Sequence, residues 1–162
     1  MNYLGFKKEE IIPVVKELNI LLSNYHVYYQ NLRNFHWNIK GENFFDLHNQ
    51  FEDLYNDARL KIDEIAERIL TLRNRPLSRF TDYLEVGTVA EAGKEENDRE
   101  MVLTILENHQ ILIQSLRSVI ENAAKVSDEG TIDMAGSFLE NLEKKSWMLD
   151  AWAVRSKKNI EV

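Results

Sequence analysis

Apolar residues recur at steps of three and four through four long segments of the chain. The segments run over roughly residues 8–39, 45–74, 95–124 and 131–156. This spacing is typical of amphipathic α-helices that each bury one face, and it predicts four helices of about 25–32 residues. In the first segment the predicted buried stripe comprises Ile11, Ile12, Val15, Leu18, Leu22, Tyr25, Tyr29, Leu32 and Phe35. Pro13 is tolerated only within a first helical turn, so the start of this helix stays open.

The breaks between the segments predict how the helices connect. The loop at 40–44 contains Gly41 and is short, so we expect the first two helices to be antiparallel neighbours. The link over 76–94 is long enough to return the chain to the other end of a bundle, and PLSRFTDYLEVG within it predicts a short helix. One long crossover between two helical hairpins is the ferritin-like topology. The predicted fold is therefore all-α, a ferritin-like four-helix bundle with a short helix in the crossover between the second and third helices.

The composition limits the class of protein without identifying it. A chain of 162 residues predicts one domain over 1–162, since domains usually hold about 100–200 residues. The absence of cysteine removes disulfides, thiolate metal sites and thiol nucleophiles. A net charge of −7 disfavours binding to nucleic acid and to anionic membranes. No apolar run reaches the ~18 residues of a membrane span, and the sequence starts without a secretory leader, so we expect a cytoplasmic protein with no membrane partner.

Histidines and carboxylates are the remaining candidates for chemistry. Di-iron ferritins usually carry Glu-x-x-His on two helices of one chain. No Glu or Asp lies three positions before any of the four histidines, which are His26, His36, His48 and His109. We expect His109 to be a core residue, because it is in step with the apolar stripe of the third helix, and His26 to be a packing or surface residue beside three tyrosines. A metal site in this chain is therefore built differently or is absent.

The second predicted helix carries an imidazole and three carboxylates on one stripe: His48, Glu52, Asp63 and Glu67. At 100° per residue their positions span about 100° of arc. Burying these groups together without partners would be very costly, whereas a cation would compensate them. A polar interface network without metal is the alternative interpretation.

The length of this stripe predicts a dimer. His48 and Asp63 lie about 22 Å apart along the helix axis, too far for one small metal site. If two copies of the helix pack antiparallel about a two-fold axis, the first half of one stripe faces the second half of the other, in two equivalent sites. His36 ends the first helix beside the short loop and can reach the same pocket. Two imidazoles with carboxylates suit iron, manganese or zinc, and the lack of sulfur disfavours copper(I).

Four stretches of the chain carry a specific signature. NLRNFHWNIKGENFFDLHNQFEDLY spans 31–55, and DEIAER spans 63–68. PLSRFTDYLE spans 76–85, and TIDMAGSFLENLEKKSWML spans 131–149. In these stretches the chain resembles the Dps-type mini-ferritins (DNA-binding proteins from starved cells), and the resemblance covers nearly all of its length.

The resemblance implies a hollow homododecamer with di-iron ferroxidase sites at its two-fold interfaces. Its metal ligands would be His36, His48 and Glu52 from one subunit, and Asp63 and Glu67 from the neighbour. Many family members have Asp at the position of Glu52, and Glu reaches one methylene further, so direct and water-mediated ligation both stay open there. Trp37 matches the family's tryptophan beside the iron, where it would trap stray oxidising equivalents.

The resemblance also implies an activity. The family oxidises Fe(II), with hydrogen peroxide in preference to oxygen, and stores Fe(III) as a mineral in the cavity, which protects against oxidative stress. Two irons each give one electron, so peroxide becomes water without releasing hydroxyl radical. Iron enters through pores on three-fold axes near the start of the last helix, where Glu129 and Asp133 resemble the pore acids and Asp128 lies nearby. Zinc or manganese would be substitutes for iron.

Two other functions are open for such a shell. One is a DNA-compacting nucleoid shell with little ferroxidase activity, and the other is a structural or cell-surface interaction shell. Family members that bind DNA often use flexible tails rich in Lys and Arg. Here Lys7 and Lys8 are followed at once by two glutamates, and the other end of the chain offers Arg155, Lys157 and Lys158. We therefore do not expect DNA binding through the tails.

Overall fold

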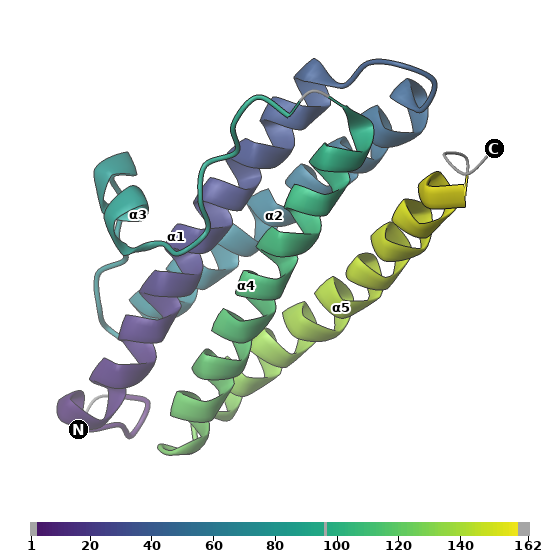
Figure 1. Ribbon diagram of the computed structural model, residues 1–162. Helices are drawn as coiled ribbons and strands as arrows, with labels where there is room; N and C mark the ends of the chain where they lie inside the picture. Colours follow the sequence, from purple (N-terminus) through teal and green to yellow (C-terminus); the bar gives the residue numbers. More distant parts are fainter. Residues whose placement is uncertain (1–2, 96, 159–162) are drawn as a thin grey trace.

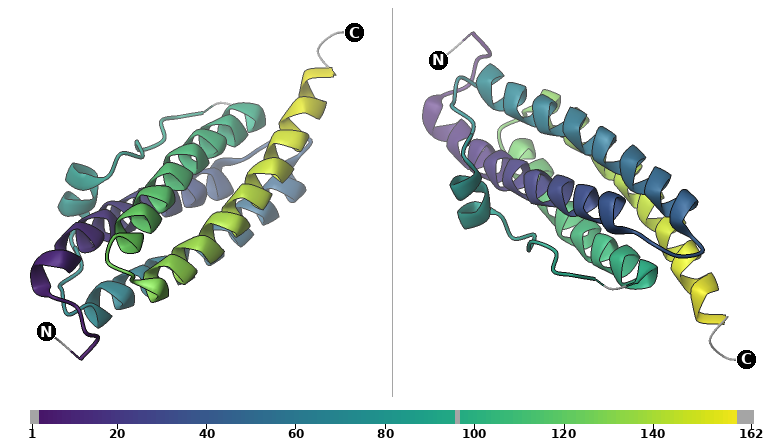
Figure 2. Two further views of the ribbon diagram at one scale, coloured as in Figure 1. Left: turned by 90° about the horizontal axis from the view of Figure 1, so that it is seen from below. Right: turned by 90° about the horizontal axis from the view of Figure 1, so that it is seen from above.

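Five α-helices form within residues 3–95 and 97–158, the part of the chain that the computed structural model describes (Figure 1). Their bounds are α1 Lys8–Asn38, α2 Phe44–Thr71, α3 Phe80–Val86, α4 Asp98–Ala124 and α5 Glu129–Lys158. The four long helices lie side by side, and the short α3 lies outside them against α1 (Figure 2). The predicted four-helix bundle with a short helix in its crossover is confirmed.

Local sequence signals mark some of the helix ends. α4 begins at an N-cap, Asn97, whose side chain accepts a hydrogen bond from the Glu100 amide at 2.9 Å. The loop after α1 contains Gly41 with φ of 104°, a conformation that favours glycine. Pro13 lies beyond the first turn of α1, contrary to the prediction. The helix tolerates it there because the ring is exposed and only one backbone hydrogen bond is lost.

α1 is the central helix of the bundle, since it contacts α2, α3 and α4. Its buried surface therefore extends round the helix and includes residues outside the predicted stripe: Val14, Leu21, Val27 and Tyr28. The prediction for Ile12 was wrong, because 51% of its surface is exposed near the start of the helix. His109 is a buried core residue, as predicted.

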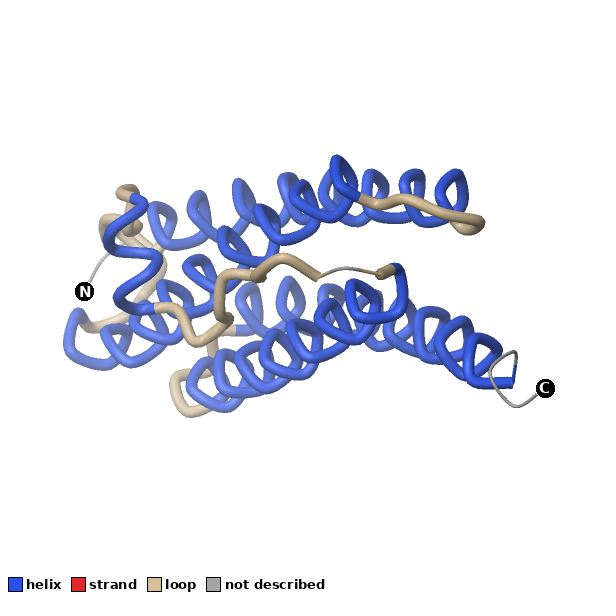
Figure 3. The backbone as a smooth tube through the Cα atoms, turned by 45° about the horizontal axis from the view of Figure 1, so that its top comes forward, coloured by secondary structure: helices blue, strands red, loops and turns tan. Residues whose placement is uncertain are grey.

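The crossover between α2 and α4 returns along the length of the bundle, beside α1 (Figure 3). Asparagine side chains of α1 hold it by its backbone. Asn24 Oδ1 accepts hydrogen bonds from the amides of Thr88 and Val89 at 2.6 and 3.0 Å. Asn31 accepts from the Ala92 amide at 2.8 Å and donates to the Ala90 carbonyl at 3.0 Å. These buried amides satisfy crossover backbone that has no helical partner.

α2 and α5 are joined by polar side chains. The ammonium of Lys61, a buried residue, contacts Asp57 of its own helix and Asn141 of α5, the latter at 3.0 Å. Lys145 of α5 lies 2.9 Å from the same Asp57 carboxylate. Partial burial opposes ionisation of Asp57, but hydrogen bonds from the two ammonium groups outweigh it and lower the pKa of this carboxyl. Hydrogen-bonded charges therefore link these two helices in addition to the shared apolar core.

None of the helices in the described part of the chain combines the length and the hydrophobicity needed to cross a lipid bilayer.

Candidate metal centre

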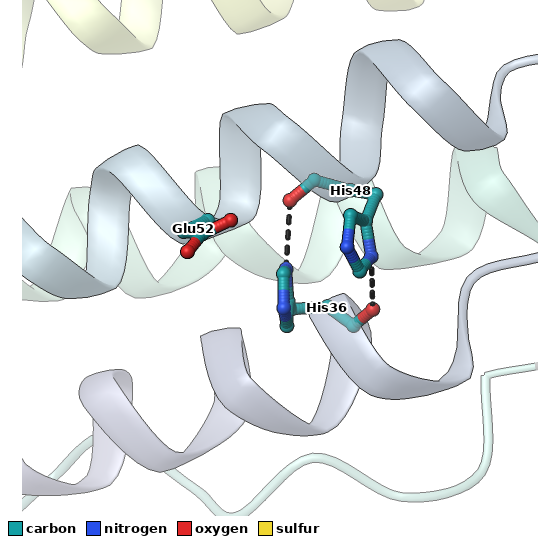
Figure 4. Close-up of side chains that lie close together, drawn as sticks. All are labelled: His36, His48 and Glu52. Carbon is teal, nitrogen blue, oxygen red and sulfur yellow. Dashed lines mark hydrogen bonds between the residues drawn. The ribbon is translucent and has the colours of Figure 1, made fainter.

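Two histidines meet at the end of the bundle where α1 turns into α2 (Figure 4). His36 lies in the last turn of α1 and His48 near the start of α2. Their rings stack, with centroids 3.8 Å apart and planes 20° from parallel. Asn43, in the loop between the two helices, donates a hydrogen bond to Asp98 at the start of α4 over 2.6 Å. The short loop is thus anchored, and it fixes how the two helix ends approach each other.

Each imidazole is oriented by the backbone of the other histidine. His36 Nδ1 lies 2.8 Å from the His48 carbonyl oxygen, and His48 Nδ1 lies 2.8 Å from the His36 carbonyl oxygen (Figure 4). A carbonyl oxygen can only accept, so both Nδ1 atoms carry a hydrogen. The lone pair of each neutral ring then lies on Nε2. This is the arrangement of a metal-binding histidine, whose other ring nitrogen donates to a backbone carbonyl.

Glu52 completes a group of three candidate ligands. One ligand atom each from His36, His48 and Glu52 can be chosen so that all three lie within 4.8 Å of one another. His36 is buried, and the other two are half-buried. Two imidazole nitrogens and one carboxylate are ligand types that suit a borderline divalent cation, and they leave further coordination positions open. The structure thus brings together three of the five predicted ligands within one chain.

Tyr55 of α2 is a member of this site that the sequence analysis did not identify. Its pKa is raised by partial burial and by the nearby negative charge of Glu52. Its ring also contacts His36 edge-on, with centroids 5.3 Å apart. The signal for this role was available, because Tyr55 follows Glu52 by three positions on one helical face.

Asp63 and Glu67 lie apart from this group in the single chain. Asp63 follows Glu52 by 11 residues, about 16 Å along the axis of α2. Both carboxylates are exposed, and the described structure places no histidine of the same chain with them in a metal-binding group. Their predicted role as ligands supplied by a neighbouring subunit stays a prediction.

Trp37 follows His36 but lies on the outer side of α1, with 58% of its surface exposed. The guanidinium carbon of Arg33 lies 4.7 Å from its ring centroid and 5.3 Å from that of Tyr29. The Tyr29 ring in turn contacts Tyr55 at 5.9 Å. Aromatic side chains therefore continue from the metal-binding group along α1.

The predicted pore residues lie at the opposite end of α2, where α5 begins. Glu129 and Asp133 are exposed, whereas Asp128 is buried, with 1% of its surface exposed. Asp128 forms an ion pair with Arg68 and accepts hydrogen bonds from the backbone amide and the hydroxyl of Thr131, at 3.2 and 2.6 Å. Its carboxylate is thus already paired within the protein, where it stabilises the start of α5.

The tails show one ion pair in the part that the structure describes. Lys7 binds Glu10 at 3.0 Å, so a basic charge near the start of the chain is compensated. The side chains of Arg155, Lys157 and Lys158 lie outside the described residues.

A comparison with protein families identifies the class of protein to which this chain belongs. The ferritin-like domain family matches residues 15–158 of this chain. The chain thus carries a ferritin-like domain over most of its length.

Individual relatives narrow the class. A DNA protection during starvation protein from Porphyromonas gingivalis is 44% identical over 159 residues, which cover 96% of this chain and 98% of that protein. A Dps structure from Vibrio cholerae O1, a member of a superfamily of ferritin-like diiron-carboxylate proteins, matches with a TM-score of 0.91 and 39% identity over 94% of this chain and 96% of its own. A Dps structure from Bacillus brevis matches with a TM-score of 0.87 and 37% identity over 91% and 99%. The chain belongs to the Dps family of ferritin-like proteins.

Proposed function

We propose that this protein oxidises Fe(II) at sites shared between two subunits, preferably with hydrogen peroxide, and stores the Fe(III) product in a hollow dodecamer. The observation that carries the proposal is the pair of reciprocal hydrogen bonds between His36 and His48. They hold two Nε2 lone pairs ready beside the carboxylate of Glu52, before any metal arrives. The kinship with a ferritin-like diiron-carboxylate protein from Vibrio cholerae supports iron as the substrate.

The second half of each site would come from a neighbouring subunit. A group of two imidazoles and one carboxylate is a small ligand set for two irons, and the exposed Asp63 and Glu67 offer the missing carboxylates. An antiparallel pairing of two α2 helices about a two-fold axis brings the ends of their stripes together twice. Zinc and manganese fit the same nitrogen and oxygen ligands and would compete with iron.

The reaction consumes two Fe(II) for each peroxide. Each iron gives one electron, the O–O bond breaks, and two protons from solvent complete two molecules of water. The Tyr55 phenol lies beside the charge of Glu52, which raises the pKa of this tyrosine, and its ring contacts His36, so Tyr55 borders the proposed ligands. Trp37 would trap oxidising equivalents that leave the site, and Glu129 with Asp133 would attract Fe(II) at the entry pores.

Co-assembly of two inactive variants tests the shared site. One variant carries His36→Ala and His48→Ala, and the other carries Asp63→Asn and Glu67→Gln. Each alone should oxidise Fe(II) slowly under anaerobic addition of peroxide. Subunits unfolded together and reassembled at equal amounts should recover about a quarter of the wild-type sites, because half of random dimers are mixed and each mixed dimer holds one intact site.

Two measurements make the result decisive. The same two variants mixed after separate assembly are the control and should stay inactive. Gel filtration should show iron co-eluting with a large particle, at two Fe(II) consumed per peroxide. Co-assembled variants that remain inactive while the particle forms would overturn the intersubunit site.

A further inference from the structure

A buried hydrogen-bonded chain crosses the middle of the bundle, away from the metal-binding group. It joins α1, α4 and α5 through Tyr28, His109 and Ser146. The Tyr28 hydroxyl lies 2.8 Å from His109 Nε2, and His109 Nδ1 lies 2.8 Å from Ser146 Oγ. Tyr28 and His109 are almost fully buried, with 2% and 1% of their surfaces exposed.

The hydrogen bond of Ser146 determines where each proton lies along this row of three side chains. The Ser146 hydroxyl donates its single hydrogen to the Leu142 carbonyl at 2.7 Å. Ser146 Oγ must therefore accept from His109 Nδ1, which places the imidazole hydrogen there. Nε2 then carries the lone pair, and the phenol of Tyr28 donates its hydrogen bond to it. Tyr28 is thus a phenol whose proton already has a base in contact.

The base is free to take that proton. Burial, together with the nearby charges of Lys145 and Lys61, lowers the pKa of His109 to about 3. The imidazole is therefore neutral at ordinary pH. A phenol that loses one electron becomes a far stronger acid than this imidazolium, so the proton still moves from Tyr28 to His109 upon oxidation.

We propose that Tyr28 is a redox-active tyrosine, which gives one electron to a strong oxidant while its phenolic proton moves to Nε2 of His109. The products are a neutral tyrosyl radical and an imidazolium. The proposal rests on the proposed function for its oxidant: when a site holds a single iron, Fe(II) and peroxide yield Fe(III), hydroxide and hydroxyl radical. The radical accepts the electron from Tyr28 and becomes hydroxide. A second Fe(II) later returns the electron, and His109 returns the proton, which restores the phenol.

Aromatic side chains supply a route for electron transfer between the candidate metal site and the Tyr28–His109 pair. His36 contacts Tyr55 at 5.3 Å between centroids, and Tyr55 contacts Tyr29 at 5.9 Å. Tyr29 is the chain neighbour of Tyr28. An oxidising equivalent formed beside His36 can therefore pass between rings in contact as far as Tyr29, and the last step to the buried pair joins residues adjacent in the chain.

Tyr25 provides a matched control within the same core. Its ring lies 6.1 Å from that of Tyr28, and it is equally buried. Among the described residues its hydroxyl has no hydrogen-bond partner. Its phenolic proton thus has no base to move to, and removal of this hydroxyl leaves no other group unpaired.

Photo-oxidation of the metal-free protein by a flash-quenched ruthenium complex tests the pair without iron. Wild type and Tyr25→Phe should show a long-lived tyrosyl absorption that forms more slowly in D2O. Tyr28→Phe should lose this component. His109→Gln, whose amide accepts the hydrogen bond but not the proton, should lose it too and covers the case in which Tyr28→Phe misfolds. An unchanged tyrosyl yield in folded Tyr28→Phe or His109→Gln would overturn the proposal.

A second arm uses one Fe(II) per site, excess peroxide and electron paramagnetic resonance of frozen samples. A tyrosyl signal in wild type that Tyr28→Phe lacks would support the complete proposal. Iron oxidation with the same radical signal in both proteins would overturn the role of Tyr28 while the proposed function stands. A photochemical radical without any iron oxidation would instead overturn the proposed function.

Discussion

The imidazoles of His36 and His48 stack on each other, and each donates its Nδ1 hydrogen to the backbone carbonyl of the other, both at 2.8 Å. One of the two carbonyls lies in the last turn of α1, where carbonyl groups lack helical donors. A carbonyl at the end of a helix thus orients the ring of a predicted metal ligand, His48.

Removal of either histidine should therefore weaken metal binding. His48→Ala deletes one ligand and the ring on which His36 stacks, while the backbone carbonyl at position 48 that orients His36 remains. We expect the affinity for zinc, measured by calorimetry on the metal-free protein, to fall by on the order of 100-fold. His26→Ala is the control, since that ring stacks on Tyr83, away from the site. Equal zinc affinity in wild type and His48→Ala would place metal binding elsewhere.

Helical periodicity predicted which residues share a face, and this was enough to find His48 and Glu52 together. The short loop placed His36 beside them for the same reason. Periodicity does not specify hydrogen-bond partners, so the reciprocal bonds of the imidazoles and the role of Tyr55 required coordinates. The buried asparagines of α1 were missed because their partners are backbone groups of a distant crossover, which no local pattern encodes. Asp128 was noted only as lying near the predicted pore acids, because its ion-pair partner Arg68 is 60 residues away in the sequence.

Arg68 should be a strong determinant of stability. Its guanidinium binds the buried Asp128 and donates to the Thr131 hydroxyl at 2.9 Å. Arg68→Ala leaves a buried carboxylate without its counter-ion, and we expect the free energy of unfolding to fall by about 3–5 kcal/mol. Arg117→Ala removes an exposed ion pair with Glu143 and should cost only about 0–1 kcal/mol. Urea unfolding measures both, and equal losses would contradict this account.

His109 should make the fold less stable in mild acid. Its pKa falls from 6.5 in the unfolded chain to about 3 in the folded protein. Between these two pH values the unfolded state binds a proton at His109 and the folded state does not. The stabilisation is complete above pH 6.5 and is lost as the pH falls from 6.5 toward 3, with a slope of up to about 1.4 kcal/mol per pH unit. His26, whose pKa burial lowers to about 4, adds a loss of the same sign.

Urea unfolding of the metal-free protein at pH 7 and pH 5 checks this sign. His109→Gln should be less stable than wild type at pH 7, yet lose less stability between the two pH values. His26→Gln should flatten the dependence independently, since the two rings share no contact in the described structure. A pH dependence as steep in both variants as in wild type would rule out these imidazoles as its cause.

Glu129 and Asp133 should govern how fast dilute Fe(II) reaches the sites. They are exposed, four positions apart on one face of α5, and unlike Asp128 they are not tied to Arg68. If they surround a three-fold entry pore, Glu129→Gln with Asp133→Asn should slow iron oxidation about 10-fold at low salt, because steering toward a ring of carboxylates is lost. The difference should shrink as salt screens the charges, and it should vanish when Fe(II) saturates the sites. Glu140→Gln, another exposed acid of α5, is the matched control. Stopped-flow spectroscopy measures these rates. Rates that fall equally with Glu140→Gln, or a difference that does not depend on salt, would show that Glu129 and Asp133 do not govern iron entry.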